Sequence, residues 1–355
     1  MPAEPPPTAE AFAAFAGRVY AADLIAEQQL AFVRAHAARP FFLFVPTTVP
    51  HVALQVPADE PSLVDYRRHF GVEQPYLGGN GYVPCQSPLA TYAAMITRMD
   101  REVGRLVALL EELKLTRDTI RVFSSDNGAV APGTGGIDTA RLRSNGSLRD
   151  WKGSPHEGGL RVPTVAVWPG QIPAGGVIEP PTGFEDWLPT LVELAGLADR
   201  VPVGIDGRSL VSPLRRRAPA APERMLYREL TEARWQAVVA GRWKAIRRAA
   251  GPQQHTGARP LELYDLESRS RSSRVDERRR RASRGRRTSG GVHESRARAR
   301  CRLAPALRRY RSTRSASGCL AAALTGVALA YDAPAACARR VARLQSGRPA
   351  QEPPA

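Results

Sequence analysis

The clearest structural signal in the sequence is the spacing of apolar residues between Tyr92 and Leu113. Apolar side chains recur there at positions 92, 96, 99, 103, 106, 110 and 113, at intervals that alternate between four and three. This spacing puts them on one face of an α-helix, so it predicts an amphipathic helix over this stretch. The rest of the fold must supply a layer that covers the apolar face.

Apolar runs of strand length and further helical patterns surround this helix. The continuous run Phe41–Val45 is typical of a strand that is covered on both faces, and 119–123 and 162–168 predict two more strands. Helical patterns over 23–38 and 185–197 complete an alternation of strands and helices. The alternation predicts an α/β fold, and we expect a largely parallel sheet flanked by helices.

The chain divides into parts of different character. Residues 57–87 are rich in Gly, Pro and Asp without a clear period and are expected to form a long loop. Past Pro213, short strand patterns at 237–239, 243–246 and 261–266 predict a small antiparallel subdomain. The expected organisation is a disordered start over 1–17, an α/β domain over 18–213, a small β subdomain over 214–267 and a disordered basic tail over 268–355.

The net charge of the chain is concentrated in the tail over 268–355. The chain carries a formal charge of +17, and residues 268–355 hold all of it, with 22 Arg against 5 Asp or Glu. The preceding 267 residues are therefore electrically neutral. One explanation is that the tail is an out-of-frame translation of GC-rich codons; the other is an Arg/Ser arm that binds RNA or DNA through phosphates. Because the tail has only Tyr310 and Tyr331 as rings for base stacking, nucleic acid is the less favoured partner.

Cysteine usage and hydropathy set further limits. Only Cys85 precedes the tail, so no paired disulfide framework is expected. The start of the chain lacks a basic segment followed by an apolar one, so it does not resemble a secretory signal. The apolar run Cys319–Tyr331 has 13 residues, fewer than the roughly 20 that a membrane-spanning helix needs. We therefore expect no membrane partner.

Two oxygen-bearing side chains follow the strand predicted at 119–123. Asp126 and Asn127 stand in the sequence Ser-Ser-Asp-Asn-Gly, and a carboxylate beside a carboxamide offers two hard ligands to Ca²⁺ or Mg²⁺. Taken alone, Asp-Asn-Gly is more often simply a turn sequence. In α/β sheets, however, ligands bind beyond the carboxyl ends of the strands, which favours a site here.

Two basic side chains are expected near the same edge of the sheet. His51 follows the strand predicted at 41–45, where an imidazole can bond an anionic ester or protonate a leaving oxygen. Lys152 stands in a Gly-flanked loop before Glu157-Gly158-Gly159 and can act as a point charge on a sulfate or phosphate. Each residue alone also fits an ordinary loop or surface position. Together with the candidate cation pair they suit a tetrahedral anionic ester, but no nucleophile stands in a recognisable motif.

The ordered set of segments resembles the sulfatase family, specifically its arylsulfatase-like members. The resemblance covers about residues 18–267, in order and with the expected spacing. The matching segments are RPFFLFVPTTVPHVALQVP (39–57), YAAMITRMDREVGRLVALLEEL (92–113), TIRVFSSDNG (119–128), SNGSLRDWKGSPHEGGLRVPTVAVWPGQIPAG (144–175), FEDWLPTLVELAG (184–196), GIDGRSL (204–210), LYREL (226–230), GRWKAIR (241–247) and LELYDLE (261–267).

The resemblance implies an alkaline-phosphatase-like α/β fold with a mixed sheet, and hydrolysis of a small-molecule or glycan sulfate ester at a Ca²⁺ site. It implies that Asp126 and Asn127 are metal ligands and that His51 and Lys152 contact the sulfate group. Relatives are commonly periplasmic or secreted, although this chain shows no export signal of its own.

One departure from the family pattern concerns the nucleophile. The family uses a formylglycine made from the first residue of a Cys/Ser-x-Pro-x-Arg motif, and this chain has no such motif. In the family this motif, two aspartate ligands and a Lys/His pair precede the position of Asp23, so we expect an amino-terminally truncated member that does not turn over sulfate esters by itself. The alternatives are a non-catalytic relic or a binding protein for sulfated ligands. A phosphatase or phosphodiesterase of the same superfamily needs more His and Asp metal ligands than these residues supply.

Overall fold

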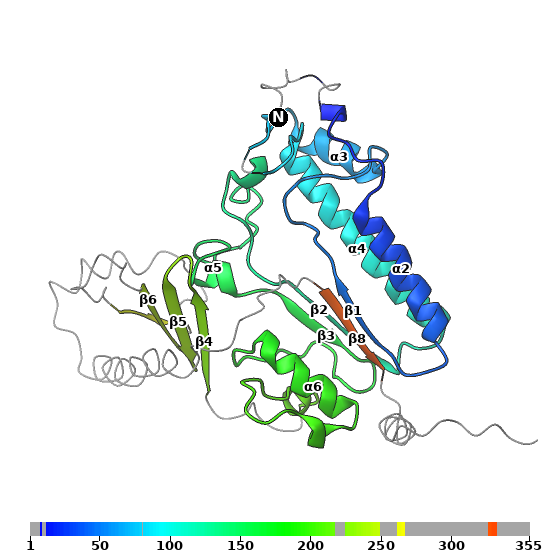
Figure 1. The fold of residues 1–355 in the computed structure, drawn as a ribbon, viewed down its shortest axis with the longest axis vertical. Coiled ribbons are helices and arrows are strands. Elements are labelled where there is room, and N and C mark those ends of the chain that lie inside the picture. The colour runs from blue at the N-terminus through cyan, green and yellow to red at the C-terminus, as the bar shows by residue number, and fades with distance from the viewer. Residues whose placement is uncertain are drawn as a thin grey trace, which may run out of the picture.

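The computed structural model describes Thr8, residues 12–79, 81–216, 224–248 and 261–266, and the backbone of 326–331. Most of the start and tail that the sequence predicts to be disordered lies outside these residues. The exception in the tail is a strand, β8 (Gly326–Tyr331), which lies in the main sheet. Figure 1 shows the whole arrangement.

The main sheet has four strands in the order β1-β8-β2-β3. Strands β1 (Phe42–Pro46), β2 (Thr119–Ser124) and β3 (Thr164–Val167) lie close to their predicted positions. The expectation of a largely parallel sheet is wrong, because every pair of neighbouring strands is antiparallel. Strands β1 and β2 do run in the same direction, as a helical crossover requires, but β8 lies between them and pairs with both.

Helices cover both faces of this sheet. Helices α2 (Ala21–His36) and α4 (Pro88–Glu112) lie side by side along it, and α6 (Trp187–Leu194) packs at the other face (Figure 1). The faces follow from the alternation along β2: Phe123 packs with the α2 and α4 cluster, whereas Val122 packs with the cluster that contains Leu191 and Leu194 of α6. The predicted α/β fold class with flanking helices is thus confirmed.

A helix interrupts the segment that the sequence predicts to be a long loop. Helix α3 (Pro61–Phe70) begins where the Glu60 side chain accepts hydrogen bonds from the Ser62 backbone and hydroxyl, at 3.4 and 2.7 Å. Pro61 opens the helix, which suits the first helical position. Leu63 and its neighbours pack on α4, so tertiary contacts stabilise a helix that has little apolar pattern of its own.

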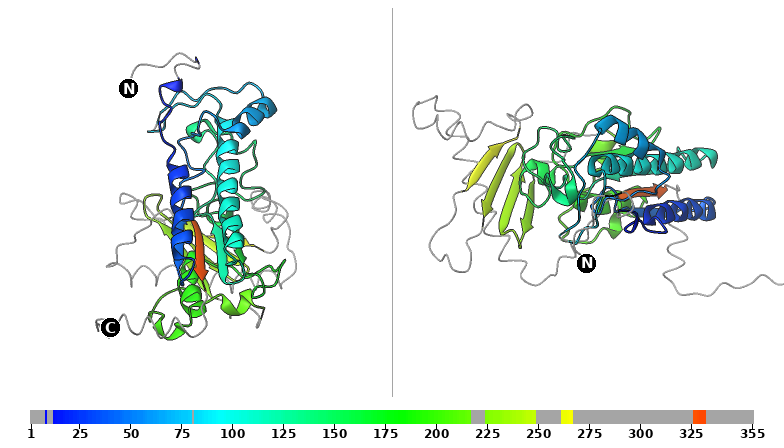
Figure 2. Two further views of the ribbon diagram at one scale, coloured as in Figure 1. Left: turned by 90° about the vertical axis from the view of Figure 1, so that its right-hand side faces the viewer. Right: turned by 90° about the horizontal axis from the view of Figure 1, so that it is seen from above.

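The carboxyl-terminal part forms a second, antiparallel sheet. It contains β4 (Met225–Leu230), β5 (Trp235–Ala240), β6 (Trp243–Arg248) and β7 (Glu262–Asp265) in that order. The predicted small antiparallel subdomain is confirmed, and β4 is a strand that the sequence patterns do not predict. Figure 2 shows this sheet at the opposite end of the molecule from α2 and α4.

Short helices connect these layers. The one-turn helices are α5 (Glu157–Leu160) and α7 (Val211–Leu214), and the 3₁₀ helices are η1 (Thr134–Gly136), η2 (Phe184–Asp186) and η3 (Ala198–Arg200). Among the residues that the structure describes, no helix has the length and apolar character to span a bilayer.

Candidate functional site

The site begins where β2 ends. Asp126 and Asn127 follow the strand after Ser125, and all three are half-buried. The Ser125 hydroxyl donates to the Asn127 carbonyl at 3.0 Å, which closes the turn. The two predicted metal ligands are thus on a short connection at the carboxyl end of a buried strand, where the sequence places them.

Backbone contacts join this turn to the loop that carries Lys152. The amide of Gly128 donates to the Gly159 carbonyl at 3.1 Å, and the amide of Lys152 donates to the Ala129 carbonyl at 2.8 Å. A Cβ atom on Gly128 would stand 1.7 Å from the carbonyl oxygen of Gly158. The two chains approach so closely that only glycine fits, and the two candidate segments are therefore held against each other.

His51 and Lys152 meet although 101 positions separate them in the sequence. The Lys152 Nζ lies 2.9 Å from the His51 Nε2, and both residues are solvent-exposed. The His51 Nδ1 contacts the Val52 carbonyl oxygen, which can only accept a hydrogen bond. The imidazole therefore carries its proton on Nδ1, and Nε2 accepts a hydrogen bond from the ammonium.

This pair is suited to an anion. An ammonium group supplies three donors and one positive charge, and a His51 ring protonated on Nε2 would add a second donor directed at the same place. Because both groups face solvent, an arriving oxyanion can replace their mutual hydrogen bond. The structure brings together the two side chains that the sequence predicts to contact an anionic ester.

The two candidate metal ligands, Asp126 and Asn127, supply few oxygen atoms for a cation. Asp126 and Asn127 offer one carboxylate and one carboxamide, whereas Ca²⁺ takes about six to eight oxygen ligands. Within the described ranges, no cluster of three or more His, Cys, Asp or Glu side chains could hold a metal ion. The oxygen ligands that these two residues offer do not by themselves make a calcium site.

Among the residues that the structure describes, no side chain at this site is arranged as a nucleophile. Cys85 is buried, its thiol donates to the Thr91 hydroxyl at 3.4 Å, and burial raises the pKa of that thiol, which disfavours the reactive thiolate. Ser154, His156 and Asp150 lie together, but Ser154 Oγ and Asp150 Oδ2 both contact the same ring atom, His156 Nδ1, at 3.0 and 2.6 Å. A catalytic triad needs the serine and the carboxylate on opposite ring nitrogens, so this cluster is not one.

Comparison with known proteins identifies the family of this chain. The family model named Sulfatase matches residues 5–197, which is more than half of the chain. The chain belongs to the sulfatase family. This agrees with the resemblance found in the sequence, and the relatives support sulfate ester hydrolysis as the activity associated with the family.

Individual relatives span several substrate classes. The chain is similar to mouse (Mus musculus) steryl-sulfatase, with 34% identity over 206 residues that cover 57% of this chain and 29% of that protein. It is 33% identical over 192 residues to dog (Canis lupus familiaris) N-acetylgalactosamine-6-sulfatase, covering 52% of this chain and 30% of the relative. It therefore spans about a third of the length of these curated sulfatases.

Solved structures share the architecture. The crystal structure of Ps i-CgsB in complex with k-i-k-neocarrahexaose aligns with a TM-score of 0.56 and 25% identity, over 74% of this chain and 52% of that one. A structure described under glycosaminoglycan metabolism by Bacteroides thetaiotaomicron aligns with a TM-score of 0.52 and 25% identity, over 70% and 48% of the two chains. These sulfatase neighbours confirm the alkaline-phosphatase-like fold.

The sequence patterns miss three side chains that reach the Lys152 loop. Trp235, Lys244 and Tyr264 contact Gly153, Glu157 and His156 respectively. Spacing gives no signal for them, because each lies more than 80 residues from its partner. The one available hint is compositional: Lys244 is one of only three lysines in the whole chain.

Proposed function

We propose that this chain carries the sulfate-recognition part of a sulfatase active site, in which His51 and Lys152 bind the sulfate group of a sulfate ester. The observation that supports this most directly is the 2.9 Å contact between the Lys152 Nζ and the His51 Nε2. Two groups that can each bear positive charge gain by sharing an anion between them, since the anion satisfies both.

The chemistry that this pair can perform is charge stabilisation and proton donation. Hydrolysis of a sulfate ester leaves negative charge on the sulfate oxygens and on the departing oxygen. Lys152 would stabilise the sulfate oxygens, and a His51 ring protonated on Nε2 would donate to the departing oxygen. These are the steps available to this chain's own residues.

We further propose that the chain binds sulfate esters without turning them over. The family nucleophile is made from a Cys/Ser-x-Pro-x-Arg motif, and the sequence contains none. Cys85, the one cysteine among the described residues, is buried away from solvent. The relatives point to steroid or glycan sulfate esters as the substrate class, and the site as described fits the sulfate group common to both.

Isothermal titration calorimetry tests this function. It measures the affinity of the purified full chain for 4-nitrophenyl sulfate and for inorganic sulfate. We expect Lys152→Met to weaken sulfate binding by about tenfold or more, because a charged hydrogen bond is worth about 1.5–3 kcal/mol. Lys114→Met is the matched control, since Lys114 is exposed beyond the end of α4. Release of 4-nitrophenol should not exceed that of buffer.

Two results would contradict the proposal. Equal sulfate affinity in the two lysine variants would remove Lys152 from the site. Sustained hydrolysis of 4-nitrophenyl sulfate by the pure chain would show that a nucleophile is present after all.

A further inference from the structure

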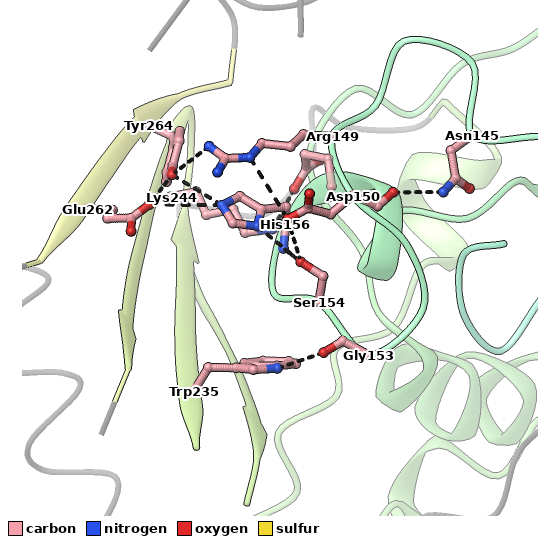
Figure 3. Close-up of polar contacts among 11 residues, drawn as sticks. Asn145, Arg149, Asp150, Gly153, Ser154, His156, Trp235, Lys244, Glu262 and Tyr264 are labelled. Atoms are coloured by element: carbon pink, nitrogen blue, oxygen red, sulfur yellow. Dashed lines mark hydrogen bonds and ion pairs between the residues drawn. The ribbon is translucent and has the colours of Figure 1, made fainter. Parts of the chain in front are cut away.

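Side chains from the carboxyl-terminal sheet converge on the short segment that carries Lys152 (Figure 3). The indole of Trp235, on β5, donates to the Gly153 carbonyl at 2.9 Å, and Trp235 is only 5% exposed. The acceptor of this hydrogen bond belongs to the residue that directly follows Lys152. On its other side, the Lys152 amide is bonded to Ala129. The backbone around Lys152 is thus fixed both to the turn after β2 and to β5.

A buried ion pair makes the second connection. The Lys244 ammonium, on β6, lies 2.7 Å from a carboxylate oxygen of Glu157, and Lys244 is 2% exposed. Burial lowers the pKa of Lys244, and the Glu157 carboxylate opposes that change. Burying an ammonium is expensive, and a buried ion pair gives little net stability over an apolar pair of the same volume. What such a pair does provide is a fixed position for the groups it joins.

The third connection comes from β7. The Tyr264 hydroxyl lies 3.2 Å from the His156 Nε2 and accepts a hydrogen bond from Arg149 at 3.3 Å. Burial, followed by the charge of Arg149, lowers the pKa of His156, whose ring lies between Asp150 and Tyr264. Three adjacent strands therefore each contribute one side chain to the segment 152–159.

We propose that the carboxyl-terminal sheet is a positioning clamp for Lys152, in which Trp235 and Lys244 fix the 152–159 segment so that the Lys152 ammonium stays against His51. Neither Trp235 nor Lys244 contacts the sulfate; both act through the backbone of the segment. The inference rests on the proposed function only in its last step, where the position of Lys152 determines sulfate affinity. The clamp itself is measurable without sulfate.

Trp235→Phe is the sharpest test, because it removes the indole donor and keeps an aromatic ring. Trp243→Phe is its matched control: Trp243 lies on the same sheet, and its ring stacks 5.3 Å below Arg242, which is ion-paired with Asp265 of β7. We expect hydrogen exchange of the amides in 152–159 to accelerate by about fivefold or more in W235F and to stay unchanged in W243F. Exchange in α4 should match the wild type in both variants.

The small number of lysines provides a second readout that is independent of sulfate. Acylation with an N-hydroxysuccinimide ester, located by mass spectrometry, reports on Lys114, Lys152 and Lys244, the three lysines of the chain. In the wild type, Lys152 should react more slowly than the exposed Lys114, since its ammonium is hydrogen-bonded to His51. In W235F the Lys152 rate should rise toward that of Lys114.

A single and a double variant of the Lys244–Glu157 ion pair separate the effect on Lys152 position from the effect on fold stability. Lys244→Met alone leaves Glu157 without its partner and should lower the melting temperature. The double variant Lys244→Met/Glu157→Gln removes both charges and should recover most of that loss. Sulfate affinity should remain about threefold or more below that of the wild type in both, because neither variant holds the segment.

The outcomes distinguish the two proposals. If the wild type does not bind sulfate but W235F still changes exchange and Lys152 acylation, the clamp stands and the proposed function fails. If W235F leaves both measurements as in the wild type, or if the double variant regains full sulfate affinity, the clamp is wrong. Should W235F fail to fold, Tyr264→Phe allows the same measurements, because it removes only a hydroxyl.

Discussion

At the scale of single residues, the pair Asp126 and Asn127 makes a quantitative prediction about Ca²⁺. With two protein ligands we expect a dissociation constant in the millimolar range, so 1 mM Ca²⁺ would stabilise the fold by only about 0.4 kcal/mol. This corresponds to a rise in melting temperature of less than about 2 °C. Thermal unfolding of the full chain with 1 mM Ca²⁺ or with EGTA measures it.

The same experiment detects a complete calcium site if one exists. A micromolar site would add about 4 kcal/mol at 1 mM Ca²⁺, a rise of roughly 8 °C or more. Asp126→Asn would abolish that rise, whereas Asp118→Asn, an exposed carboxylate before β2, would not. Such a pattern would refute our expectation of weak binding.

Sequence patterns single out candidate site residues where the chemistry is local. Asp126 and Lys152 are recognisable because the residues beside them, Asn127 and the glycines, carry the pattern. His156 has no such pattern: its partner Tyr264 lies 108 positions away, and only the folded chain brings the two rings together. Sequence patterns do not identify Trp235 and Lys244 for the same reason, because the contacts of these residues depend on long-range packing.

At the scale of secondary-structure elements, Glu60 fixes the start of α3 against α4. Its carboxylate is fully buried and paired with Arg98 and Arg101 of α4. Burial alone would raise the pKa of Glu60, but hydrogen bonds from Arg101, Ser62 and Arg98 outweigh it and lower the pKa to about 2. Because Arg98 is also bound through two bonds to Asp23 of α2, one network joins three helices.

Glu60→Gln should therefore destabilise the fold by about 2–3 kcal/mol at pH 7. The pKa of this carboxyl is lower in the folded state than in the unfolded state, so its contribution is complete above about pH 4.5 and is lost as the pH falls toward 2. Urea unfolding at pH 7 and pH 3 measures the difference between variant and wild type, which should shrink at the lower pH.

Glu27→Gln is the control for this measurement. Glu27 of α2 pairs with Arg105 of α4, but its side chain is 59% exposed, and such surface pairs contribute little. We expect a change below about 0.5 kcal/mol at either pH. Equal losses for E60Q and E27Q would show that the Glu60 network does not hold the helices together.

The predicted elements are those with a strong pattern of their own. Helix α4 and strands β1 and β2 lie within a few residues of their predicted bounds, because apolar periodicity is intrinsic to them. Helix α3 was not predictable in this way: its capping residue Glu60 needs arginines from α4, and its apolar contacts also lie on α4. Its stability comes from tertiary partners, which a local pattern does not contain.

At the scale of the whole molecule, the main sheet is covered unevenly. The β1 residues Phe42 and Phe44 are 57% and 41% exposed on one face, and the β3 residues Val165 and Val167 are 52% and 41% exposed on the other. Helices α2 and α4 cover β1 and β2, whereas α6 covers β2 and β3. The chain spans about half the length of the sulfatase structures it matches.

The sequence could not predict which strand lies at the centre of this sheet. It singles out the apolar run Cys319–Tyr331 only as too short to cross a membrane, within a tail whose composition predicts disorder. In the structure, Gly326–Tyr331 pairs with β1 on one side and β2 on the other. Pairing between segments that lie more than 200 residues apart leaves no local signature, and composition averages over so short a segment.

The central position of β8 gives the last prediction. Ala328 lies opposite Phe44 of β1 and Val122 of β2, so Ala328→Pro removes a backbone donor from the middle of the sheet and disturbs both ladders. We expect a loss of about 2 kcal/mol in the free energy of unfolding. Because the freed edges of β1 and β2 are templates for pairing with other chains, we also expect association on size-exclusion chromatography. A monomeric A328P with unchanged stability would instead place this segment with the disordered tail that the sequence predicts, and would leave the slot between β1 and β2 to another strand.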